Sequence, residues 1–440
     1  MSVSTSTLRS KYIHRLPSLD PYLRRGRVER VTGLILEARG PRVPIGELCR
    51  IETSAGRLLA EVVGFRDQST LLMALQETAG LGPGDVVTAL GQPMRIGVGM
   101  GLLGRIVNGL GEPIDGLGPF TPEDFRVTAA SAPDPLRRTR IREPLSVGVR
   151  AIDGMLTVGQ GQRIGIFSGS GIGKSILLGM MARYTSADVV VIGLIGERGR
   201  EVREFIENDL GVAGRAHCVV VAVTSDQWPL LRARGAMVAT TIAEYFREQG
   251  LRVLLLIDSI TRYCQAMREI GLSLHEPPAT KGYPPSVFAA LPKLLERAGA
   301  SEKGSITAFY TVLVEGDDML EPVADATRSI LDGHIVLSRK LAAMGHYPPI
   351  DILDSLSRVM VNIADPEHLA AATRLRDWLS AHRDAEDLIH IGAYAKGSNP
   401  KVDIALERLP KIEKYLRQPL DEPATGEDAR ARLLTLASEA

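Results

Sequence analysis

The chain has little of what marks a secreted or membrane-spanning protein. Its 440 residues include only three cysteines, Cys49, Cys218 and Cys264. An odd, scattered set excludes a disulfide framework and indicates reduced thiols and a cytoplasmic location. The first residues, MSVSTSTLRSKYIHR, lack the apolar core of a signal peptide. The longest apolar stretches, such as DVVVIGLIG at 188–196, are too short to span a bilayer.

Charge of one sign and aromatic residues are also scarce. The formal net charge is +0 and aromatic residues make up 5% of the chain. A general nucleic-acid binder carries a basic excess, so no nucleic-acid partner is expected. Hydrophobic residues at 45% and charged residues at 24% are typical of a globular protein with apolar cores. The length favours two or three domains.

The chain begins with a polar, basic arm over residues 1–27. Six cations in this arm face a single acid, Asp20. The pattern fits either a solvated tail or a helical arm that binds a partner or an acidic membrane surface. From 28 to 92 the pattern changes to short strand-type runs punctuated by Gly and Pro, which predicts a small β-barrel or sandwich. These runs are RVTGLILEA, LCRIET, RLLAEVVGF, STLLMAL and DVVTAL.

Between 150 and about 345 apolar strands alternate with helix-period segments, which predicts a doubly wound, largely parallel α/β sheet. The expected strands are 163–168, 188–195, 217–223, 253–258, 305–313 and 333–338. The expected helices are 174–185, 198–210, 228–249 and 286–298. After about 362, residues 367–389 and 401–418 have the periodicity of amphipathic helices. We therefore place the domains at 28–95 (barrel), 96–360 (nucleotide-binding) and 361–440 (helical), after the arm.

The stretch SGSGIGKS at 168–175 carries the clearest chemistry. An apolar strand precedes its glycines, and Lys174 and Ser175 open a helix. This context predicts a phosphate-binding loop, in which backbone N–H groups and a helix N-terminus hold an anion. Lys174 would reach the terminal phosphates of ATP and Ser175 would ligate Mg²⁺. The predicted loop consists of Ser168, Gly169, Ser170, Gly171, Ile172, Gly173, Lys174, Ser175 and Ile176.

The loop departs from the usual pattern at its first position, where Ser168 replaces glycine. Serine is small enough for the loop to close. The alternative, a chance glycine-rich turn, is disfavoured by the strand before the loop and the helix after it.

Two strand ends carry acids that suit a nucleotide site. Asp258 ends the run RVLLLID, where a carboxylate can reach Mg²⁺ at the edge of a parallel sheet. An ordinary helix-capping aspartate is the alternative. Glu197 follows VVVIGLIG and can orient a water molecule, and Glu201 can support the metal. Periodicity alone favours a solvated first helical turn for these two glutamates.

Several stretches together resemble the catalytic subunits of rotary ATP synthases and their relatives. They include FSGSGIGKS, GERGREVREF, LLLIDSITRY, PATKGYPPSVFAALPKLLERAG, HYPPIDILDSLSR and GLLGRIVNGLGEPIDG. The resemblance runs from about 28 to 415. It implies a β-barrel, a RecA-like P-loop core and a C-terminal helical domain.

The resemblance also implies residue roles. Glu197 would activate water, Lys174 and Ser175 would be the phosphate and magnesium ligands, and Asp258 and Glu201 would lie in the outer shell of Mg²⁺. Arg198 and Arg262 would belong to the phosphate-side network. Tyr347 would stack on adenine. Arg358 would be supplied to the site of a neighbouring subunit.

Within this family the chain resembles the type III export ATPases, and among them the flagellar ones. Because it carries Lys174, Glu197 and Arg358 together, one polypeptide can complete every interface of a homohexameric ring. The stretch IHIGAYAKGSNPKVDIAL lacks the acidic patch of the synthase catalytic chain, and injectisome relatives tend to carry Glu at Ala393.

The resemblance implies further partners and a location. The partners are export regulator and stalk proteins, export substrates and chaperones, a membrane export gate and, through the N-terminus, acidic lipids. The expected location is the cytoplasmic side of the inner membrane. The alternatives are an injectisome ATPase, a rotary synthase subunit and a Rho-like RNA translocase. The last would need RNA-stacking aromatics and basic loops.

Overall fold

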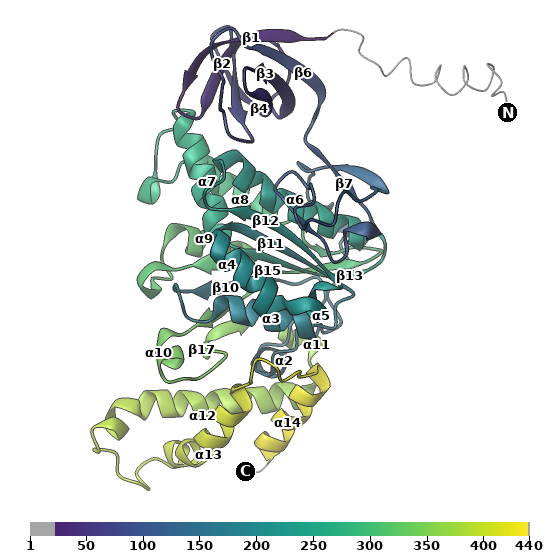
Figure 1. Ribbon diagram of the computed structural model, residues 1–440. Helices are drawn as coiled ribbons and strands as arrows, with labels where there is room; N and C mark the ends of the chain where they lie inside the picture. The colour runs from purple at the N-terminus through teal and green to yellow at the C-terminus, as the bar shows by residue number, and fades with distance from the viewer. Residues whose placement is uncertain (1–22, 439–440) are drawn as a thin grey trace, which may run out of the picture. The chain divides into compact units, whose positions relative to one another are not determined.

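A computed structural model describes residues 23–438 (Figure 1). Most of the expected basic arm, 1–27, therefore lies outside the described residues. The chain divides into two compact units. One holds the described residues up to Arg95 with Leu272–Glu276, and the other holds Ile96–Gly271 and the described residues from Pro277 onward. Over the range 23–438, no helix combines the length and the apolar character that crossing a membrane requires.

The first unit contains a closed barrel with strand order β1-β2-β5-β4-β3-β6. Its strands are β1 (Arg25–Thr32), β2 (Ile35–Arg39), β3 (Glu47–Thr53), β4 (Gly56–Arg66), β5 (Ser69–Ala74) and β6 (Val86–Pro93). The interior is filled by alternate apolar side chains such as Leu36, Ile51 and Leu72. A barrel, and not a sandwich, is thus the correct alternative.

Two sequence-based details of the barrel were wrong. The run RVTGLILEA is not one strand but the hairpin β1–β2, which turns at Gly33 with φ +59°. Glycine adopts this left-handed backbone without steric cost, so the chain reverses there. In addition β1 begins at Arg25, and residues 25–27 pair with β6 instead of belonging to the arm.

The second unit is built on a sheet with strand order β17-β16-β10-β15-β13-β11-β12-β8, with β14 paired to β15 (Figure 1). Its strands are β8 (Ile106–Val107), β10 (Arg163–Ser168), β11 (Val189–Glu197), β12 (Cys218–Thr224), β13 (Arg252–Asp258), β14 (Gly299–Ala300), β15 (Ser305–Leu313), β16 (Gly333–Leu337) and β17 (Ile350–Ser357). All pairs are parallel except β16–β17 and β14–β15. The six expected strands are confirmed, whereas β17 was not expected. A separate two-stranded ribbon joins β7 (Arg95–Val98) to β9 (Asp124–Val127).

Helices connect and cover these strands. They are α2 (Arg150–Met155), α3 (Lys174–Tyr184), α4 (Gly199–Glu204), α5 (Gly211–Arg215), α6 (Pro229–Glu248), α7 (Ile260–Ser273), α8 (Pro285–Leu295), α9 (Pro322–Ile330) and α10 (Arg339–Ala343). The helix expected over 198–210 is instead α4 followed by a π-helical segment, Phe205–Leu210. Gly179 of α3 packs so closely on this segment that a Cβ there would lie 2.7 Å from Asp209 Cβ.

The C-terminal part is helical, as expected. It contains α11 (Met360–Ile363), α12 (Pro366–His390), α13 (Pro400–Leu416) and α14 (Gly426–Ser438), the last of which was not expected. Figure 1 shows the three long helices gathered at one end of this unit. Their apolar residues, including Leu375, Ile412 and Leu433, continue the core that covers the sheet. Helices and sheet therefore share one continuous apolar core. The cysteines are buried free thiols, as expected.

Candidate active site

The predicted phosphate loop lies between β10 and α3. Strand β10 ends at Ser168 and α3 begins at Lys174. Gly171 and Gly173 have φ values of +76° and +92°, which glycine tolerates best. No atom lies within 4 Å of a Cβ built on Gly171, so this side of the loop is open. No side chain caps the start of α3, so its first N–H groups can bind an anion, as the sequence predicts.

Three predicted site residues meet at the carboxyl ends of adjacent strands. Glu197 ends β11 and Asp258 ends β13, and these parallel strands pair Leu194 with Asp258. Lys174 Nζ lies 3.5 Å from Glu197 Oε1 and forms an ion pair with Asp258 Oδ1. The side chains of all three are at most 12% exposed. The cation thus separates two buried acids that would otherwise repel each other.

The environment shifts the charge equilibria of this cluster. The pKa of Glu197 is raised to about 7, chiefly by burial and also by Asp258 and Glu201, against the attraction of Lys174. For Lys174, burial opposes the charge, but the carboxylates of Asp258 and Glu197 outweigh it and raise the pKa. Glu197 therefore titrates near neutral pH, in the range that suits a group that accepts or orients a proton.

Arg262, on α7, lies behind Glu197. A Cβ on Gly196 would be 2.8 Å from Arg262 Cβ, so the glycine permits this close approach. The positive charge of Arg262 lowers the pKa of Glu197. The Arg262 guanidinium also donates from Nη1 to Gln265 Oε1 at 3.0 Å.

The remaining predicted residues lie at the rim of this cluster. Ser175 is exposed in the first turn of α3. The Arg198 side chain is 78% exposed, and its Nη1 lies 3.5 Å from Glu201 Oε1. Tyr347 is 42% exposed, and its ring lies beside Gly173, where a Cβ would be 3.3 Å from Tyr347 Cε1. An aromatic face is therefore available next to the phosphate loop.

Arg358 is the predicted residue that the fold keeps apart. Its N–H donates to Asp332 O, and the N–H of Asp332 donates to Arg163 O at the start of β10. The phosphate loop follows the other end of that strand. Six residues of strand span roughly 20 Å. The backbone of Arg358 therefore lies near the amino end of β10, whereas Lys174 of the same chain follows its carboxyl end.

One polar contact of the site was not predicted. Thr311, in the middle of β15, places Oγ1 2.7 Å from Asp258 Oδ1. In sequence it is one polar residue within the apolar run of an inner strand, SITAFYTVL. Only the register between β13 and β15 reveals its partner.

The residues present fit a nucleotide with a divalent cation. The Ser168 hydroxyl is buried and has no hydrogen-bond partner among the described residues, although it begins the loop. A lysine and two carboxylates converge beside the open glycine loop. Phosphate oxygens would satisfy the lysine and the loop N–H groups, and the carboxylates and the Ser175 hydroxyl are oxygen ligands of the kind that Mg²⁺ prefers.

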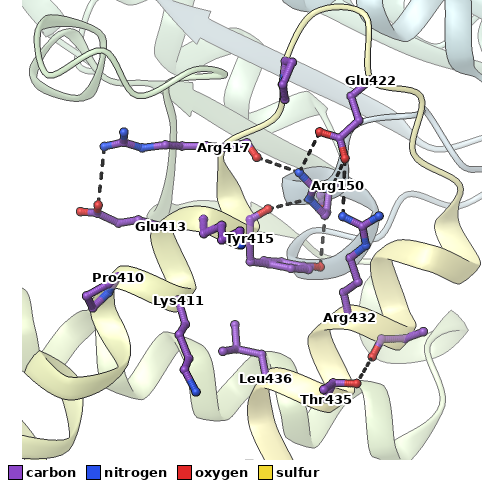
Figure 2. Close-up of a pocket in the computed structure, with 13 residues that line it drawn as sticks. Arg150, Pro410, Lys411, Glu413, Tyr415, Arg417, Glu422, Arg432, Thr435 and Leu436 are labelled. Carbon is purple, nitrogen blue, oxygen red and sulfur yellow. Dashed lines mark hydrogen bonds and ion pairs between the residues drawn. The ribbon is translucent and has the colours of Figure 1, made fainter.

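A cavity of about 870 Å³ lies in a different part of this unit, between α13, α14 and the start of α2 (Figure 2). Arg150 closes one side of it. Its guanidinium donates to Tyr415 O at 2.7 Å, to Arg417 O at 2.8 Å and to Glu422 Oε1 at 2.8 Å. Figure 2 shows these partners converging on one side chain. The cavity therefore lies where α2 meets the C-terminal helices α13 and α14.

Comparison with known proteins agrees with this architecture over three segments of the chain. Residues 28–91 match the ATP synthase alpha/beta family, beta-barrel domain, and 148–357 match its nucleotide-binding domain. Residues 364–435 match the T3SS EscN ATPase C-terminal domain.

Individual relatives cover nearly the full length. The flagellum-specific ATP synthase of Bacillus subtilis is 53% identical over 426 residues, 95% of this chain and 96% of that protein. A type 3 secretion system ATPase of Xanthomonas euvesicatoria is 49% identical over 442 residues, all of both chains. The assembled ATPase EscN of enteropathogenic E. coli superposes with a TM-score of 0.89 at 44% identity, covering 94% of this chain and 100% of that chain.

Proposed function

The chain belongs to the ATP synthase alpha/beta family and is a type III export ATPase that hydrolyses ATP, and from this premise we propose how its own residues perform the reaction. The observation that carries the proposal is the position of Lys174 Nζ between Glu197 and Asp258, at the ends of adjacent parallel strands.

The phosphate loop and Lys174 bind the phosphates of ATP. Nucleotide phosphates compete with the two carboxylates for the lysine, because both are anions within its reach. Gly171 and Gly173 keep the backbone free of side chains where phosphate oxygens approach. Tyr347 supports the base by stacking, as its exposed ring beside Gly173 permits.

Ser175 and Asp258 are the residues that would hold Mg²⁺, and Glu201 would support them. When bound, the cation neutralises charge on the phosphates. The carboxylate of Asp258, buried at the strand end, supplies the negative charge that the ion requires.

Glu197 orients the attacking water. Its pKa near 7 lets the carboxylate form predominate at slightly alkaline pH and accept a hydrogen bond from that water. Arg262 favours the charged form of this carboxylate, and the exposed Arg198 adds positive charge at the rim of the site.

Arg358 completes the site of a neighbouring chain. Its backbone lies near the opposite end of the strands from its own phosphate loop, so a second copy must present it. An arginine supplied in this way is worth about 10³–10⁵ in rate. Identical chains that share sites head to tail close into a ring, which we take to be a homohexamer.

The assembled ring acts at the cytoplasmic face of the inner membrane in flagellar export. It engages export substrates and their chaperones at the export gate, with regulator and stalk proteins, and the N-terminal arm contacts acidic lipid. The flagellar system is favoured by the 53% identical Bacillus protein, and the injectisome is the alternative. The EscN structure in complex with its central stalk EscO, at a TM-score of 0.87, supports a stalk partner.

Glu197→Gln tests the assignment. The nearly isosteric amide should leave nucleotide affinity within about twofold of wild type and lower turnover by at least about a hundredfold, since only the charge that orients water is lost. The matched control is Glu204→Gln, the same substitution on the exposed face of α4, where the glutamate pairs with Arg200. Turnover of Glu197→Gln equal to that of the control would contradict the proposal.

A further inference from the structure

Thr311 is a polar residue buried within the central sheet, and its hydroxyl needs a hydrogen-bond partner there. It lies on β15, between β10 and β13, and is 0% exposed. A hydroxyl buried among apolar side chains costs stability unless it is hydrogen-bonded. Its only acceptors within reach among the described residues are Asp258 Oδ1 at 2.7 Å and Ile257 O at 3.4 Å.

A hydroxyl has one proton to donate, and the two distances show which acceptor receives the hydrogen bond. A distance of 2.7 Å is typical of an O–H···O bond, whereas 3.4 Å is outside the usual range. The acceptor at 2.7 Å is also a carboxylate, which forms the stronger bond. Thr311 therefore donates to Asp258.

We propose that Thr311 is a positioning residue that fixes the Asp258 carboxylate for Mg²⁺ binding; this inference rests on the proposed metal role of Asp258. The hydroxyl and Lys174 both hold Oδ1, and no described residue provides a partner for Oδ2. One oxygen is thus anchored and the other is left for the cation.

The contribution of Thr311 grows when nucleotide binds. In the structure Lys174 also restrains Asp258. Once phosphates draw the lysine away, the Thr311 hydroxyl is the remaining side-chain bond that keeps the carboxylate oriented. The loss of a partner behind a metal ligand typically costs about 10–100-fold in metal affinity.

Thr311→Val, which has nearly the same shape and no donor, tests the inference. A fluorescent ADP analogue is bound to the full-length protein in EDTA and then across a Mg²⁺ titration. We expect wild-type affinity in EDTA and a Mg²⁺ requirement raised about 10–100-fold. Thr311→Ser should restore the wild-type titration, because it returns the hydroxyl.

The control is Thr240→Val, which removes a buried hydroxyl that bonds only to Ala236 O within α6. A Thr311→Val titration that coincides with this control overturns the inference. If Thr311→Val does not fold, Thr311→Cys provides the test, since a thiol is a weak donor. Wild-type Mg²⁺ dependence of the cysteine variant would then overturn it.

Asp258→Asn separates this inference from the proposed function. Loss of Mg²⁺ dependence in Asp258→Asn, with a normal titration of Thr311→Val, refutes the role of Thr311 alone. Unchanged Mg²⁺ dependence in Asp258→Asn refutes the metal role of the aspartate itself.

Discussion

Replacing Arg150 by methionine should weaken the packing of the C-terminal helices on α2. The side chain is 4% exposed and has three partners beyond residue 410. Methionine fills similar space but leaves Tyr415 O and Arg417 O without their donor. Each buried unpaired carbonyl costs about 1–3 kcal/mol. Glu422 loses its ion pair with Arg150 but keeps the one with Arg432 at 3.5 Å, so this loss adds at most about 1 kcal/mol.

These contributions add to an expected loss of about 2–7 kcal/mol of unfolding free energy. Trp378 on α12 is 9% exposed and can report the unfolding of these helices in a Trp228→Phe background, because the chain has only two tryptophans. The urea midpoint should fall by about 1–2 M.

Arg430→Met serves as the control. Arg430 pairs with Asp365 in the same helical part, but the two side chains are 39% and 42% exposed. Such a pair contributes less than about 1 kcal/mol. If Arg150→Met unfolds at the same urea concentration as this control, the guanidinium does not hold α2 to the C-terminal helices and the reasoning fails.

Three further results are expected. Turnover should rise with pH through about 7 as Glu197 loses its proton, and a flat rate between about pH 6 and 8 would show that its charge is not needed. Gly173→Ala should weaken binding of a fluorescent ADP analogue about tenfold or more, since φ +92° strains alanine; unchanged affinity would contradict this. Mixing inactive Lys174→Ala and Arg358→Ala chains should restore phosphate release above either alone. No recovery in co-assembled rings, measured also in single turnovers, would place Arg358 in its own site.

The strand, loop and helix that carry the predicted phosphate site were predictable because their signal is local. Strand, glycines, lysine and helix follow one another within 168–176, and the structure keeps that order. Glu197 and Asp258 were predictable as strand ends, since carboxyl ends of parallel strands share one edge. The β1–β2 hairpin was missed because Gly33 interrupts a continuous apolar run without Pro or Asn beside it.

Other features depend on contacts between distant segments, which composition and periodicity do not encode. Thr311 and Asp258 are 53 residues apart and meet through strand register. The role of Arg150 requires the return of the chain at Tyr415, 265 residues later. The exposure of the Arg198 side chain depends on its orientation, and the sequence motif does not determine that orientation.

Lys174 and Arg358 lie near opposite ends of the strands of one sheet. Each chain therefore has one surface that would supply an arginine and another that would accept the arginine of a neighbour. Under the proposed sharing, an open row of n chains holds n − 1 complete sites, and only closure supplies the last one. A single chain would hold none. The enzyme would then need no separate inhibitor while dispersed: ATP consumption per chain would report how many neighbours have already joined, and dilution alone would switch it off.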